Sequence, residues 1–232
     1  MSPDNAAFVR QTLSSISPAM VMGAFKLSTG DISSAPATTR TNLERFVDWT
    51  VIVFGLPITD QTLWVWHKTG ERRFLFANFL LSEASKALNR ALAGAGETCV
   101  DVVDVFGQEL SMTELGVRAG LGTRGLNNLL LHPTYGAWMQ LHAVFSRIDI
   151  PAAERLTESV CISCRSCFDA CPAHALADGE FRAEACRVLV AAPWYAKSKA
   201  VALAENSYIE CAECIRVCPI GRRPEGIFEW RH

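Results

Sequence analysis

The stretch that decides the fold of the second half of the chain is CISCRSCFDACP, residues 161–172. Its cysteines follow the spacing C-x2-C-x2-C-x3-C and end on Pro172. A related stretch, CAECIRVCP, covers residues 211–219 with the spacing C-x2-C-x3-C-P. Of the nine cysteines in the chain, only Cys99 lies before residue 161. Disulfide scaffolds spread their cysteines through the fold, whereas metal sites cluster them, so this distribution indicates metal.

These spacings are typical of two [4Fe–4S] clusters, in which the fourth cysteine of each run ligates the other cluster and is expected to open a helix. The first cluster is therefore assigned to Cys161, Cys164, Cys167 and Cys218. The second is assigned to Cys171, Cys211, Cys214 and one further ligand. A symmetrical ferredoxin would take that ligand from position 208, which is Tyr208, so we assign Cys186. Zinc sites do not require a C-x2-C-x2-C-x3-C-P run.

The composition and the net charge argue against some classes of function. The 232 residues are 50% hydrophobic and 20% charged, which fits one large domain or a domain with a small addition. The net charge of −2 gives no basic surface, so nucleic acid is an unlikely partner. The first residues lack a signal pattern, and the apolar window 51–66 is interrupted by Pro57 and Asp60. We therefore expect a cytoplasmic protein with no membrane association.

Local patterns before the cysteines predict an α+β chain. A domain boundary is expected where the sequence changes character, giving domains 1–155 and 156–232. Ser111 and Glu114 form a capping box that opens a helix ending at Gly120. Periodicity predicts the other elements, in chain order a helix within 1–19, buried strands at 20–27 and 50–56, a helix at 78–93, a strand at 99–106 and a half-exposed strand at 137–147. His67, Lys68, Arg72 and Arg73 are assigned to a polar turn, and His174 to the helix after Cys171.

The most glycine-dense stretch is AGLGTRGLNNLLLHPTYGAW, residues 119–138. Glycines let a backbone lie flat against a large ligand. The stretch does not follow a predicted strand, so it is not a dinucleotide fingerprint. A tight structural connection is the alternative explanation.

Together with the cysteine pattern and its Cys186, this stretch resembles the family of epoxyqueuosine reductases and reductive dehalogenases. The resemblance implies a cobalamin-binding domain of nitroreductase-like α/β fold, followed by a small bacterial-ferredoxin-like domain. It also implies that a corrinoid would lie against Gly120, Gly122, Gly125, Asn127, Tyr135 and Gly136. Nitroreductase-like folds also bind flavin, so FMN is the alternative cofactor.

The expected function is an iron–sulfur oxidoreductase. An external low-potential donor would pass electrons through the clusters to the corrinoid, which would reduce a small-molecule substrate. Asp104 is the candidate proton donor, because Asp104 to Glu109 is the nearest match to the family's acidic segment, although it lacks the proline. A solvated carboxylate is the alternative for Asp104, and a buried apolar role is expected for Cys99. The alternative function is a ferredoxin-like electron-transfer or corrinoid-handling accessory protein that serves a partner redox protein.

Overall fold

The computed structural model describes residues 4–33, 36–70, 72–107, 109–177, 180–186 and 201–221. The chain forms two compact units, each built from several segments. The first consists of Met1–Leu56, Leu80–Gly122 and Leu141–Thr157. The second consists of Pro57–Phe79, Thr123–Gln140 and Glu158–His232. One crossing between the units, at residue 157, lies close to the predicted boundary, but the second unit also takes in two earlier segments.

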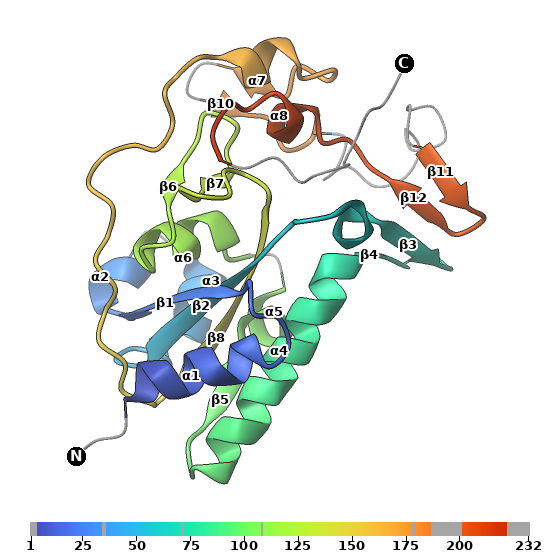
Figure 1. Cartoon of the computed structure of the whole chain (residues 1–232). Helices are drawn as coiled ribbons and strands as arrows, with labels where there is room; N and C mark the ends of the chain where they lie inside the picture. Colours follow the sequence, from blue (N-terminus) through green and yellow to red (C-terminus); the bar gives the residue numbers. More distant parts are fainter. Residues whose placement is uncertain are drawn as a thin grey trace. The chain divides into compact units, whose positions relative to one another are not determined.

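A four-stranded sheet with the order β1-β2-β8-β5 organises the first unit (Figure 1). Its strands are β1 (Val21–Lys26), β2 (Thr50–Pro57), β8 (Met139–Ser146) and β5 (Cys99–Asp101). β1 and β2 are antiparallel, and every residue of β2 is buried. The two predicted buried strands are therefore confirmed, since a continuous apolar run suits a strand covered on both faces.

Helices supply the rest of the first unit's core. They are α1 (Asn5–Ser14), α2 (Thr29–Ile32), α3 (Ala37–Glu44), α4 (Phe76–Gly94), α5 (Val102–Phe106) and α6 (Met112–Arg118). The predicted stripe of α4 is buried at Leu81, Ala84, Leu88 and Leu92. The predicted cap is also confirmed, because the Ser111 hydroxyl accepts a hydrogen bond from the Glu114 amide.

Two expectations for this unit were wrong in part. Residues 99–106 are not one strand, because β5 ends at Asp101 and α5 follows. The Asp101 carboxylate accepts the Val103 amide at 2.8 Å, and such capping favours a helix start over strand continuation. β8 exists as predicted, but it is not half-exposed at its end, because all four residues from Ala143 to Ser146 are buried.

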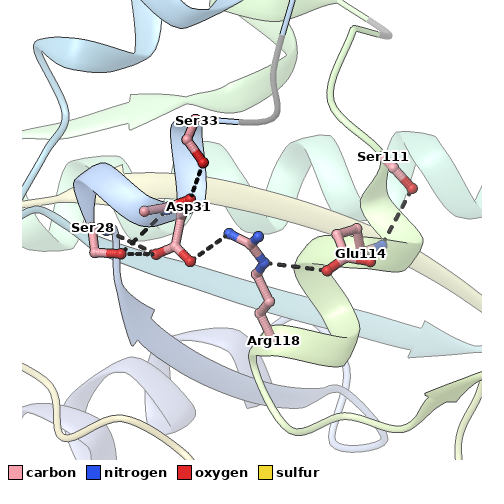
Figure 2. Close-up of polar contacts among 7 residues, drawn as sticks. Ser28, Asp31, Ser33, Ser111, Glu114 and Arg118 are labelled. Carbon is pink, nitrogen blue, oxygen red and sulfur yellow. Dashed lines mark hydrogen bonds and ion pairs between the residues drawn. The ribbon is translucent and has the colours of Figure 1, made fainter.

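Arg118 connects α2 with α6 in the first unit. Figure 2 shows its guanidinium between Asp31, at 2.9 Å, and Glu114, at 3.2 Å. Burial alone would raise the pKa of Asp31, but hydrogen bonds from Ser28 and the Arg118 charge outweigh it, so this pKa is lowered. Because α6 leads directly into the glycine-rich stretch, this ion pair fixes where that stretch begins.

The second unit contains another four-stranded sheet, with the order β11-β12-β3-β4. Its strands are β11 (Val201–Ala204), β12 (Ser207–Ile209), β3 (Trp66–Thr69) and β4 (Arg72–Leu75), and the helical turn η1 (Gln61–Trp64) precedes them. The predicted polar turn at 67–73 is therefore a hairpin of β3 and β4. The smaller elements are β6 (Thr123–Arg124), β7 (Leu130–Leu131), β9 (Leu176–Ala177), β10 (Glu180–Phe181), α7 (Ser166–Asp169) and α8 (Glu213–Arg216).

The α+β fold class is confirmed by this mixture of helices and antiparallel strands. Among the described residues, no helix combines the length and the apolar character needed to cross a membrane.

Candidate functional site

The four cysteines assigned to the first cluster line one pocket. They are Cys161, Cys164, Cys167 and Cys218, together with apolar residues that include Leu131, Ile162 and Ile220. Among the residues that the structure describes, no three His, Cys, Asp or Glu side chains lie close enough to hold a single metal ion. Thiols spaced around a pocket suit a larger four-iron cluster better than a mononuclear zinc site.

The loop between Cys161 and Cys167 is shaped by two left-handed residues. Ser163 has a φ of 57° and Arg165 a φ of 64°. Successive backbone amides in such turns form concave nests that bind anions, including iron–sulfur clusters. Burial raises the pKa of Cys167, and the neighbouring thiols of Cys161, Cys164 and Cys218 raise it further. The loop therefore brings thiols and backbone amides to one place.

The second assigned set also lies together, and it includes Cys186. Cys186 and Cys214 pack against the buried Cys171, in a small core that contains Ala175. Burial raises the pKa of Cys214, and nearby thiols add to this increase, in the order Cys211, Cys186, Cys171 and Cys167. The Ala175 amide donates a hydrogen bond to Cys171 Sγ at 3.3 Å, a contact of the kind that tunes cluster potentials. Cys186 is thus placed where the assignment requires it.

The helices near the cysteines differ from expectation. α7 precedes Cys171, and α8 contains Cys214 and ends before Cys218. Cys171 is followed by a turn in which His174 has a φ of 47°, so the predicted helix at His174 is wrong. The chain instead returns to form β9 with β10, which pack against the cysteine core.

Three glycines of the glycine-rich stretch are packed against the protein itself. A Cβ on Gly120 would lie 2.4 Å from the Glu154 carbonyl oxygen, and one on Gly136 would lie 1.9 Å from that of Ile220. A Cβ on Gly125 would lie 2.7 Å from Asn127 Oδ1. Close internal packing therefore requires glycine at these three positions, independently of any ligand.

The other three residues predicted to contact a corrinoid are Asn127, Tyr135 and Gly122, and each has a different environment. Asn127 is buried, accepts the Leu129 amide at 3.2 Å and lines the pocket of the first cysteine set. Tyr135 is half-buried, with its ring centroid 5.0 Å from that of His132. Gly122 is buried. Asn127 and Tyr135 are therefore the side chains of the predicted set that remain available to a cofactor.

Asp104 is exposed in the first turn of α5, as expected of a solvated carboxylate. A neighbouring carboxylate, Asp101, was missed. Its Oδ2 lies 2.7 Å from His142 Nε2 and accepts the Ser85 hydroxyl at 2.5 Å. Burial would raise the pKa of Asp101, but the hydrogen bonds from His142 and Ser85 outweigh it, so the pKa is lowered. No local signal links these residues, because antiparallel pairing of β5 with β8 brings them together.

Iron analysis and electron paramagnetic resonance test the cysteine assignment. The reconstituted protein should hold about eight irons per chain, the sum of two cubanes. Cys186→Ala should lose the second cluster and keep the first, and Cys161→Ala should do the reverse. The control is Cys99→Ala, because burial raises the pKa of Cys99 to about 12, which leaves a protonated thiol. Unaltered iron and spectra in Cys186→Ala would show that the assignment is wrong.

Asp101→Asn tests the buried polar network. Asparagine can still cap α5, so the substitution removes mainly the charge. Because the folded-state pKa of Asp101 is lowered, its stabilisation is present above the ordinary value of 3.8 and is lost as pH falls through the folded value. Near neutral pH the variant should lose about 1–3 kcal/mol of unfolding free energy.

Urea unfolding of both proteins at each pH measures this difference, with Asp104→Asn as the exposed control. A difference that persists unchanged at acid pH, or an equal loss in Asp104→Asn, would contradict the network's role.

Residues 160–221 match the family described as the 4Fe-4S double cluster binding domain. Two curated relatives are epoxyqueuosine reductases. That of Listeria monocytogenes is 33% identical over 120 residues, which are 49% of this chain and 30% of the relative. That of Bacillus subtilis is 27% identical over 158 residues, 66% of this chain and 36% of the relative. The chain thus spans about a third of the length of these relatives.

Solved structures of epoxyqueuosine reductases share the fold. The Streptococcus thermophilus structure has a TM-score of 0.61 at 18% identity, covering 92% of this chain and 65% of that chain. A Bacillus subtilis structure has a TM-score of 0.67 at 17% identity, covering 95% and 66%. A third, with a TM-score of 0.65 and 18% identity over 93% and 64%, contains an epoxyqueuosine-modified tRNA stem loop.

Two expectations change with these similarities. The net charge alone does not make nucleic acid an unlikely partner, since a relative of the same fold is solved with RNA. The flavin alternative gains no support from the matched family or the relatives. Residues 160–221 therefore match a 4Fe-4S double cluster binding domain, and the chain is similar in sequence and in fold to epoxyqueuosine reductases.

Proposed function

We propose that this chain passes electrons through two [4Fe–4S] clusters to a corrinoid, which reduces a small electrophilic substrate. The electron-transfer part of this proposal rests on the pocket lined by Cys161, Cys164, Cys167 and Cys218. In that pocket Cys218, from the second motif, lies with three cysteines of the first motif. Four thiols that converge in this way are the ligand set of a cubane cluster.

The two cysteine sets adjoin each other, which supports transfer between clusters. Cys167 of the first set and Cys171 of the second belong to the same buried core. Cys167 is also close enough to Cys214 of the second set to contribute to the raised pKa of the Cys214 thiol. Electrons entering at one cluster would therefore have a short path to the other.

The corrinoid part of the proposal is supported by the resemblance of residues 119–138 and the cysteine motifs to the family. The glycines do not support it, because Gly120, Gly125 and Gly136 pack internally. Asn127 and Tyr135 are the residues that we propose to contact the cofactor. A bound corrinoid would supply a strongly reducing and nucleophilic cobalt centre, while the protein supplies binding and orientation.

We assign the proton-holding role to Asp101 with His142 in place of Asp104. Asp101 is partly buried and shares a 2.7 Å hydrogen bond with His142 Nε2, whereas Asp104 is exposed. A proton can be held between a carboxylate and an imidazole, which is the usual arrangement of a general acid–base pair. The ring of Phe54, with its centroid 5.4 Å from that of His142, limits the imidazole's freedom.

Titration with cob(II)alamin tests the cofactor. The optical and paramagnetic spectra should shift to the base-off form on binding, and FMN in a parallel titration should not bind. Tyr135→Ala should weaken binding about tenfold, which corresponds to about 1.4 kcal/mol. The control is Thr134→Ala, an exposed neighbour on the same turn. An unchanged cobalamin spectrum at concentrations well above micromolar would leave the ferredoxin-like accessory function in its place.

A second candidate substrate is a modified nucleoside within tRNA, favoured by the relatives named epoxyqueuosine reductase and by the structure solved with a stem loop. This candidate predicts submicromolar binding of a tRNA stem loop that weakens steeply between about 50 and 200 mM salt. The small-molecule candidate predicts no such binding. Fluorescence anisotropy at several salt concentrations separates the two.

A further inference from the structure

An aromatic cluster lies open to solvent at the β3–β4 hairpin of the second unit. It consists of His67, Phe74, Phe76 and Phe79, and together with Lys68 we call it the hairpin surface. The His67 and Phe74 rings are stacked at 5.3 Å, and those of Phe76 and Phe79 at 6.2 Å. Phe74 is 41% exposed and Phe79 is 51% exposed. Exposed aromatic groups of this kind mark surfaces that a partner covers.

The charge of the hairpin identifies the kind of partner. Residues 66–75 contain Lys68, Arg72 and Arg73 but only one acid, Glu71, whereas the whole chain has a net charge of −2. The hairpin sequence thus carries more basic than acidic residues, which an acidic surface complements. The partner that fits is acidic.

The hairpin is joined to the second cysteine set through the sheet. β12 pairs with β3, with Ser207 opposite His67, and the Ser207 hydroxyl lies 2.9 Å from His67 Nδ1. β12 then leads directly to Cys211. Ser207 lies four residues before Cys211, and four residues of extended chain span about 13 Å, so the strand that pairs with the hairpin ends close to the second set.

We propose that the hairpin surface is the docking site of the acidic redox protein that reduces the second cluster. This inference rests on the proposed function, because it requires the second cysteine set to hold a cluster. One electron leaves the reduced centre of the donor and enters the oxidised [4Fe–4S] cluster. No bond forms or breaks, and no proton moves. Nucleic acid is the competing occupant, and pairing of the hairpin with β12, the strand that leads to Cys211, favours the electron donor.

Anaerobic stopped-flow spectroscopy of the cluster-loaded protein tests the proposal, with a reduced acidic plant-type [2Fe–2S] ferredoxin as the donor. The double variant Lys68→Glu/Phe79→Ser should lower the second-order rate at least tenfold at low salt. The wild-type rate should fall as ionic strength rises from about 0.01 M to about 0.15 M, because the Debye length shortens from about 30 to about 8 Å.

The matched control is Arg10→Glu/Leu156→Ser, which makes the same charge change and removes an exposed apolar side chain in the first unit. Its rate should stay within twofold of wild type. Titanium(III) citrate, a small reductant that needs no docking site, should reduce the clusters of all three proteins equally.

The possible outcomes separate the two proposals. An unchanged ferredoxin rate in the Lys68→Glu/Phe79→Ser protein, with normal reduction by titanium(III) citrate, would overturn the docking site alone. Failure of titanium(III) citrate to produce a reduced-cluster signal in wild type would overturn the proposed function, and the docking site with it. Loss of tRNA stem-loop binding in the double variant, without loss of the ferredoxin rate, would reassign the surface to nucleic acid.

Discussion

The interleaving of the two cysteine motifs is the constraint on which the second unit depends. Cys218, from the second motif, closes the pocket of Cys161, Cys164 and Cys167, while Cys171, from the first motif, packs with Cys214 and Cys186. Neither motif supplies all four cysteines of a set, so the two motifs have to lie next to each other in the folded chain. Just before the second motif, β12 pairs with β3, and this pairing brings residues 57–79 into the same unit.

The order of these parts sets the direction in which we propose that electrons pass through the second unit. The hairpin surface is joined through β3 and β12 to the second cysteine set, and that set shares its core with the first. Electron transfer needs closely spaced centres and a route in from the donor. In the proposed arrangement, pairing between β3 and the distant β12 would supply the route, and the core shared by Cys167 and Cys171 would keep the centres close. The reduction potential of a bound cluster would then depend on contacts such as the hydrogen bond from the Ala175 amide to Cys171 Sγ.

Local spacing predicted two groups of cysteines, and elimination added Cys186, which lies beside Cys171 and Cys214 in the structure. The assignment of these cysteines as cluster ligands stays a prediction. The buried strands and α4 were also predictable from local spacing, since their apolar patterns repeat over a few residues. The pair Asp101 and His142 was not predictable, because strand pairing between distant segments creates it. The internal packing of the glycines was not predictable for a related reason. The backbone groups that exclude a Cβ at Gly120 belong to residue 154, and no local pattern reports them.

The close approach of Gly136 and Gly221 has a use in recognising relatives. A Cβ on Gly221 would lie 2.0 Å from the Gly136 amide nitrogen, so neither position accepts a side chain while the two backbones keep this approach. The cysteine motifs alone identify any two-cluster protein. A glycine three residues after the last cysteine, together with one closing the HPTYG turn, would mark chains that share this particular backbone crossing. Sequences with the cysteines but without both glycines must route the segment after Cys218 differently.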